Sequence, residues 1–187
     1  LSGYSTLARN EISDFILKTY SRSGSSVNIL EHVSFRANAL ISEIESGKYY
    51  GEELVTKLET AHALMNIAAL LMPTDKDTLK SYANLNYLMA EQVKDRIDIN
   101  TLDKDALASQ LLKSGVAVSL EQGLKLADSI IAKREATPIR NISGLDLLSP
   151  QQAELLRANN IVGSQETAAY YNETARTLIS MAINIAK

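Results

Sequence analysis

Residues 54–73, LVTKLETAHALMNIAALLMP, decide the fold class of this chain. Their apolar side chains recur every three or four residues, at Leu54, Leu58, Ala61, Met65, Ala68, Ala69 and Met72. This spacing places them on one face of an α-helix, whereas the side chains of a half-buried strand alternate. Pro73 ends the pattern because proline lacks the amide hydrogen that a continuing helix needs. The stretch therefore predicts a long amphipathic helix that ends before Pro73.

Similar stripes of apolar side chains lie on both sides of this stretch. They predict helices over residues 7–20, 30–44 and 79–93. The small polar residues 21–26 (SRSGSS) predict a loop between the first two helices. Four helices with short connections are typical of an antiparallel bundle. We therefore expect an all-α fold whose N-terminal domain, residues 1–95, is such a bundle.

The composition excludes several classes of site. The chain has 187 residues, a mass of 20.5 kDa, 19 basic and 22 acidic side chains, and a net charge of −3. It has no cysteine, which excludes disulfides, thiolate nucleophiles and zinc–thiolate sites, although it does not assign a compartment. The longest apolar run, residues 67–72, is much shorter than the ~20 residues of a membrane span. We expect no membrane span, and the N-terminus shows no signal-peptide pattern.

The second half of the chain differs in composition from the first. Residues 88–169 contain no aromatic side chain, which indicates a domain boundary near residues 95–97. Short helices with marked starts follow, at Asp103, at Ser119 with Gln122, and at Ser149 before Pro150. We expect a module over residues 96–163 and a closing helix over residues 164–187, with Ser164 as the N-cap of that helix. Because aromatic residues return in that helix, we expect it to pack on the N-terminal bundle.

Residues 97–162 begin with Ile-Asp-Ile-Asn-Thr and continue with a leucine-bearing helix, a hairpin and an Ala-x-x-Ile-Ile-x-x-Arg helix. The residues that fit this pattern are Leu107, Leu111, Ala127, Ile130, Ile131, Arg134, Pro138, Ile139, Ile142 and residues 145–148 and 153–162. The block resembles the tandem helix-hairpin-helix module of competence DNA-receptor proteins and of the minor pseudopilins of type II secretion. The resemblance covers about a third of the chain and implies two helical hairpins.

The resemblance also implies DNA binding, but the residues that would support it differ here. In DNA-binding members a Gly-x-Gly turn brings backbone amides close to a phosphate, whereas Gly115 is the only glycine of this turn. Residues 94–163 carry nine basic and nine acidic side chains, so they supply little net attraction for phosphates. A packing or docking module is therefore the favoured interpretation, with DNA binding as the alternative. The DNA-contact candidates for that alternative are Lys113, Gly115, Lys125, Lys133, Arg134 and Arg140.

Candidate catalytic groups are few. His32 and His62 are the two histidines, and a buried histidine with satisfied hydrogen bonds is the commoner case. Paired carboxylates occur at residues 52–53, 75–77 and 103–105, all at predicted helix starts, where acidic side chains favour the helix dipole. The chain has no nucleophile elbow, phosphate loop or dinucleotide-binding fingerprint. We therefore expect no enzyme activity, no cofactor and no metal site, and keep a His62-dependent enzyme as a minor alternative.

Two tyrosine doublets are the candidate contact residues: Tyr49 with Tyr50, and Tyr170 with Tyr171. Tyrosine suits interfaces because it is large, rigid and amphipathic. We expect one ring of each doublet to pack in the core and the other to be available for a partner. The sequence thus favours a non-catalytic structural or assembly subunit of a larger complex, such as a virion, a secretion or conjugation machine or a filament. Self-association through helix-mediated contacts is the expected mode of partnering.

Overall fold

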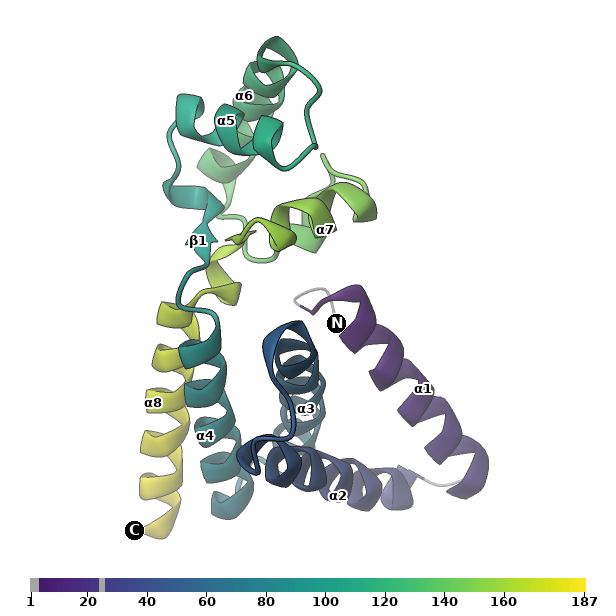
Figure 1. The fold of residues 1–187 in the computed structure, drawn as a ribbon. Helices are drawn as coiled ribbons and strands as arrows, with labels where there is room; N and C mark the ends of the chain where they lie inside the picture. Colours follow the sequence, from purple (N-terminus) through teal and green to yellow (C-terminus); the bar gives the residue numbers. More distant parts are fainter. Residues whose placement is uncertain (1–3, 24–25) are drawn as a thin grey trace. The chain divides into compact units, whose positions relative to one another are not determined.

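The computed structural model describes residues 4–23 and 26–187, and the side chains of these residues except 6, 19–23 and 26–31. Within this part of the chain the fold is all-α, as the sequence predicts (Figure 1). The α-helices are α1 (Thr6–Ser23), α2 (Ser26–Glu45), α3 (Gly51–Leu71), α4 (Lys76–Gln92), α5 (Lys104–Lys113), α6 (Leu120–Ala136), α7 (Pro150–Ala158) and α8 (Ala168–Ala186). The short elements are strands β1 (Ile97–Asp98) and β2 (Ile161–Val162) and the 3-10 helices η1 (Ile99–Thr101), η2 (Ile142–Gly144) and η3 (Ser164–Glu166).

The chain divides into two compact units. Residues 4–92 and Tyr171–Lys187 form the first, which we call the bundle unit. Val93–Tyr170 form the second, which we call the hairpin unit. The hairpin unit is thus inserted between α4 and α8 of the bundle unit. Among the described residues, no helix combines the length and the apolar character that crossing a membrane requires.

α3 is the central helix of the bundle unit. Its residues 58–65 are all buried, so this helix has neighbours around its whole circumference. Helices α1, α2 and α4 pack against it, and Tyr171 of α8 contacts its His62. The largest fully buried side chains of the unit are Ile12, Leu40, Leu58, Leu64, Met65, Leu79, Leu85 and Met89. The stripe that identifies α3 in the sequence therefore underestimates how much of this helix is covered.

Two expected boundaries were wrong. α1 continues through Ser23 and α2 begins at Ser26, so most of the predicted serine-rich loop is helical. Serine is only a weak helix breaker, because its side chain competes for backbone hydrogen bonds without preventing them. Ser164 does not cap the closing helix. It begins η3, and the hydroxyl of Thr167 accepts a hydrogen bond from the amide of Tyr170 in the first turn of α8.

In the hairpin unit, β1 and β2 form a parallel pair with Ile97 opposite Ile161 and Asp98 opposite Val162. The side chain of Asn100 fastens the segment that leads to η2. Its Nδ2 donates to the backbone carbonyl of Ile139 at 2.8 Å, and its Oδ1 accepts from the backbone amide of Ile139 at 2.8 Å. One apolar core follows, with fully buried Ile99, Leu107, Leu111, Ile130, Ile142, Leu156 and Ile161.

Helices α5 and α6 form a tight helical hairpin. The turn contains Gly115 with a φ of +83°, a left-handed conformation that favours glycine. The amide of Ala117 then donates to the carbonyl of Leu111, which closes the turn. On α6, a Cβ added at Gly123 would lie 3.0 Å from the carbonyl oxygen of Ala108 on α5. The hairpin therefore depends on glycine at two positions, once for backbone conformation and once for close packing.

Candidate functional site

The start of α6 at the first hairpin is closed by side chains of its own residues. The hydroxyl of Ser119 accepts from the amide of Gln122 at 3.2 Å, and the amide oxygen of Gln122 accepts from the amide of Val118 at 2.7 Å. This confirms the predicted capping pair. Glu121 lies in the same first turn and adds a negative charge there. The cap thus uses the amide of Gln122 in the first turn and that of Val118 before the helix, and an acidic side chain stands beside them.

The start of α7 repeats this arrangement. Ser149 accepts from the amide of Gln152 at 3.1 Å, and Gln152 accepts from the amide of Ser149 at 2.8 Å, which makes a complete capping box. Pro150 occupies the first helical position, where it has no amide hydrogen to offer. Each of the two helix starts therefore has a first-turn amide satisfied by its cap, that of Gln122 in α6 and that of Gln152 in α7.

The two caps meet at one cavity. Gln122 and Gln152 both line a cavity of about 310 Å³, together with Val116, Lys125, Leu126, Ser129 and Leu147. Val118 and Leu120 flank the cap residue Ser119 and are 85% and 53% exposed. We call Val118, Leu120, Gln122, Leu147 and Gln152 the hairpin face. These residues are aliphatic or carry amide groups, and the charged Lys125 of the same cavity pairs with Glu121.

The basic candidates for DNA contact do not form one free cationic surface. Lys125 is 3.4 Å from Glu121, and Lys133 is 3.1 Å from Asp146. Arg134 donates to the carbonyl of Ile99 at 2.8 Å, so it supports the chain before α5. Lys113 and Arg140 are exposed, at the end of α5 and between α6 and η2.

Gly115 has an accessible backbone, although its own amide already donates to the carbonyl of Leu112 at 3.1 Å. A Cβ built on Gly115 would have nothing within 4 Å, so its backbone is open on that side. A ligand could therefore approach the backbone of the first hairpin closely at this one position.

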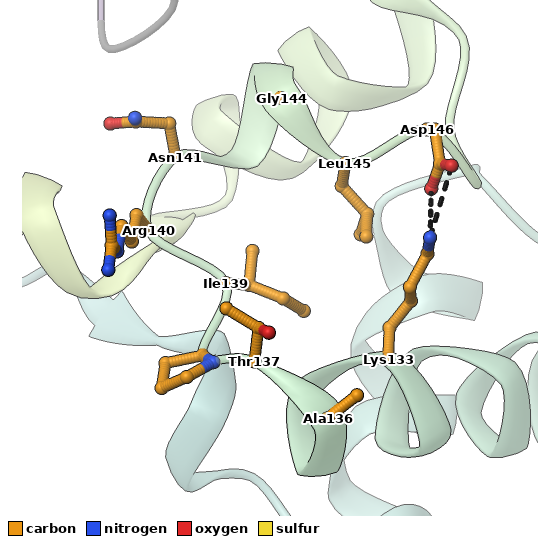
Figure 2. A pocket seen from close by; sticks show the side chains of 10 residues that line it. Lys133, Ala136, Thr137, Ile139, Arg140, Asn141, Gly144, Leu145 and Asp146 are labelled. Atoms are coloured by element: carbon orange, nitrogen blue, oxygen red, sulfur yellow. Dashed lines mark hydrogen bonds and ion pairs between the residues drawn. The ribbon is translucent and has the colours of Figure 1, made fainter.

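A second cavity of about 560 Å³ lies where α6 ends (Figure 2). Ile139 and Leu145 point toward one another across its middle, and the ion pair of Lys133 with Asp146 closes one side. Arg140 and Asn141 point to the opposite side. Because the middle of this cavity is apolar and Lys133 is paired with Asp146, Arg140 is the remaining formal charge in its lining.

His62, the main catalytic candidate of the sequence, is held as a structural group. Its Nε2 lies 3.0 Å from Oδ1 of Asn86, whose own Nδ2 donates to the carbonyl of Tyr82. This orientation of Asn86 makes Nε2 of His62 the protonated nitrogen, so Nδ1 accepts from the hydroxyl of Tyr4 at 2.8 Å. Burial lowers the pKa of His62 to about 4, against the weaker opposing effects of Asn86 and Glu59.

The most deeply buried ion pair joins Glu166 of η3 to Arg157 of α7, at 2.7 Å. The other carboxylate oxygen of Glu166 accepts from the amides of Gly163 and Ile142. Burial raises the pKa of Glu166, while Arg157 and the two amides oppose this shift. The pair fastens three segments of the hairpin unit together, and the sequence analysis did not identify it.

The acidic pairs lie where the sequence predicts them, in or beside the first turns of α3, α4 and α5. Asp75 and Asp103 accept hydrogen bonds at the starts of α4 and α5, from Thr78 and from the amide of Ala106. Within the described part of the chain, no three His, Asp or Glu side chains are grouped closely enough to hold a metal ion.

Of the four doublet tyrosines only Tyr171 packs in the core, whereas Tyr49 and Tyr170 are partly buried and Tyr50 is exposed. Tyr171 is 2% exposed and lies 5.4 Å from the ring of His62, whereas Tyr170 is partly buried. Tyr49 donates to Glu43 at 2.6 Å, which lowers the pKa of Glu43 and raises that of Tyr49. Tyr50 precedes α3 and is 82% exposed. Tyr50 is therefore the most accessible of the four.

Sequence reasoning singled out both caps but missed the hairpin face that they share. A signal was present, because Ser-x-x-Gln occurs at residues 119–122 and again at 149–152, each time at a helix start. Val118 directly precedes the first motif, and Leu147 lies two residues before the second. What the pattern does not indicate is that the two glutamines line the same cavity.

Comparisons of the chain with models of protein families, with curated proteins and with solved structures found no match.

Proposed function

We propose that the protein is a non-catalytic assembly subunit, and that its hairpin face contacts a protein, either a second copy or a neighbouring subunit of the same particle. The observation that carries the proposal is the chemistry of this face. Capping side chains hold the amides of Gln122 and Gln152 in the first turns of the two helices, and Val118 and Leu120 beside the first cap are exposed. Aliphatic side chains with amide groups and little net charge are typical of the centre of protein interfaces.

Other parts of the chain agree with a non-catalytic role. Both ring nitrogens of His62 are engaged and its environment favours the neutral ring, so it has no free nitrogen for proton transfer. The carboxylate of Glu166 has three donors within the protein. Such groups serve packing and specificity rather than chemistry.

DNA binding through the same module is the second candidate function. It is favoured by the family that residues 97–162 resemble and by the open backbone at Gly115. It requires a phosphate to approach a turn that carries Glu121 and a rim of valine and leucine. We rank it second because phosphate contacts supply most nucleic-acid affinity, and Lys125, Lys133 and Arg134 are already engaged.

The substitution Val118→Lys separates the two functions, because a new cation at the hairpin tip has opposite effects on them. It places a charge in an aliphatic contact, so we expect protein association to weaken by about tenfold or more. The same cation strengthens binding to a phosphate backbone. Mass in solution by light scattering, with and without duplex DNA, measures both effects.

The matched control is Leu70→Lys, at a 73% exposed leucine of α3 in the bundle unit. It adds the same charge outside the hairpin face, so we expect association to stay at the wild-type level. Unchanged association in Val118→Lys together with tighter DNA binding would contradict the proposed function and favour the second candidate.

A further inference from the structure

α1 is attached to the bundle unit in a different way from its neighbours. α2 buries Val33, Ala37, Leu40 and Ile44, an entirely apolar stripe. Among the described side chains of α1, Ala8 and Ile12 are buried and Phe15 and Ile16 are partly buried, while Leu7 and Leu17 are 58% and 65% exposed. The described part of α1 thus buries a narrower apolar stripe than α2 does.

Polar contacts also attach α1, and the two residues before it, to α3. The Tyr4 hydroxyl donates to Nδ1 of His62 at 2.8 Å, and the Ser5 amide donates to Glu59 at 2.9 Å. Further along α1, Glu11 accepts from Lys57 at 3.0 Å and from Thr60 at 3.1 Å. We call the surface of α3 formed by Lys57, Glu59, Thr60 and His62 the α1 groove.

A polar groove behaves differently from an apolar one when its helix leaves. Water replaces the lost partners of Glu59, Thr60 and His62, whereas exposed leucine and isoleucine gain nothing from water. Segments that bury few apolar contacts open at lower free energy than the rest of a domain. The contact of α1 with α3 has the composition of a transient interface rather than that of a core.

We propose that the α1 groove is an exchangeable docking site that takes the α1 of a second copy in place of the chain's own. The inference rests on the proposed function, because it names a second copy as one partner in the assembly. The occupant follows from the contacts themselves, since α1 already matches the charges and donors of the groove. In either arrangement Glu11 meets Lys57 and Thr60, and Tyr4 meets His62.

Because the same contacts form within one chain and between two, concentration decides which arrangement prevails. The chain's own α1 is present at an effective concentration of about a millimolar when the connection is short. α1 ends at Ser23 and α2 begins at Ser26, which is a short connection. Exchange between copies is therefore favoured only at comparable local concentrations, as inside a packed particle.

The ion pair of Glu11 with Lys57 offers a direct test. The two side chains are 3.0 Å apart and retain 38% and 18% exposure, so a carbodiimide can couple the carboxylate to the amine. Equal amounts of ¹⁴N- and ¹⁵N-labelled protein are mixed from about 0.01 to about 1 mM, bracketing the effective concentration. The mixtures are then coupled, digested and analysed by mass spectrometry, with light scattering on the same samples.

We expect cross-linked peptides that join a light Glu11 to a heavy Lys57, in a fraction that rises with concentration. If only same-label cross-links form at every concentration while the mass of the samples grows, the exchange is overturned and the assembly function stands. Same-label cross-links in samples that stay monomeric would overturn both. Lys57→Arg keeps the charge but removes the reactive amine, so its samples should lose this cross-link.

Tyr4→Phe adds a kinetic test, because it removes one contact that both arrangements share. We expect mixed cross-links to form about fivefold faster, with the final fraction unchanged. Tyr87→Phe, at a half-exposed tyrosine of α4, is the matched control and should exchange at the wild-type rate. A Tyr4→Phe variant that exchanges no faster would contradict the role given to this contact.

Discussion

Gly163 is the residue at which the hairpin unit tolerates no side chain. It follows β2, and a Cβ at this position would lie 2.3 Å from the carbonyl oxygen of Arg140 and 2.6 Å from the amide nitrogen of Asn141. Both obstacles are backbone atoms, and their segment is tied to η3 by hydrogen bonds from Ser164 and Gln165. The backbone must therefore move to admit even a methyl group.

We predict that Gly163→Ala lowers the free energy of unfolding by about 1–3 kcal/mol or more, because overpacking against fixed backbone is costly. Urea denaturation measures the change. Gly144→Ala is the control, since a Cβ there has nothing within 4 Å. Equal effects of the two substitutions would contradict the close approach at Gly163.

The lowered pKa of His62 predicts how the stability of the folded protein depends on pH. Its pKa is about 4 in the folded protein against 6.5 for the ordinary group, so the unfolded chain binds more protons between these values. Stability is then complete above pH 6.5 and falls as the pH is lowered toward 4. The difference of 2.5 pH units corresponds to about 3 kcal/mol.

The variant His62→Gln should remove this part of the pH dependence while lowering stability at neutral pH. His32→Gln, at an exposed position of α2, should retain it. Thermal unfolding between pH 4 and 7 compares the two variants with the wild type. The same slope in His62→Gln as in the wild type would show that the dependence arises elsewhere.

At the scale of the elements, the side chain of Asn100 joins two separate segments of the hairpin unit through hydrogen bonds to the backbone. Its side-chain amide pairs with both backbone groups of Ile139, and its own amide is held by Asp98. η1 is thereby fastened to the segment that connects α6 to η2. The pairing joins residues 39 positions apart in the chain.

We predict that Asn100→Ala destabilises the hairpin unit by about 2–3 kcal/mol, because the hydrogen bonds of its side chain to Asp98 and to both backbone groups of Ile139 are lost and the amide of Ile139 loses its partner. Hydrogen exchange of amides in residues 97–162 measures the loss in that unit alone. Gln151→Ala removes an exposed amide side chain of α7 and should change protection little. Equal protection in both variants would contradict the role of Asn100.

The sequence predicted the elements whose signals are local. Periodic apolar residues identify the helices, and Asp103, Ser119 and Ser149 mark helix starts that the structure confirms. The prediction for the serine-rich segment failed for a local reason, the weak helix-breaking effect of serine, whereas long-range contacts decide the failure at Ser164. Ser164 loses its expected capping role because Glu166, two residues on, is drawn into the core by Arg157 and by the amides of Gly163 and Ile142.

The features of the candidate site likewise divide into those set by local sequence and those set by long-range contacts. Capping by Ser119 and Ser149 was predictable from three or four consecutive residues, and so was the acidic charge at Glu121. The shared cavity of Gln122 and Gln152 was not, because two separate helix starts line it. The partners of His62 come from residues 4, 82, 86 and 171, which no local pattern connects.

At the scale of the whole molecule, one unit is inserted into the other, and each carries a different kind of surface. The hairpin unit presents an aliphatic face with capped helix starts. The bundle unit holds α1 through polar contacts in the α1 groove. Two separate contact surfaces on one chain are what an assembly needs in order to grow beyond a pair.

The most direct test of the central claim, that the hairpin face contacts protein rather than DNA, is the mass of the wild-type protein in solution. Light scattering over a concentration series, with and without duplex DNA at physiological salt, gives this mass. We predict that the mass rises with protein concentration and that added DNA leaves it unchanged. A protein that stays monomeric throughout the series and gains mass only with DNA would contradict the account.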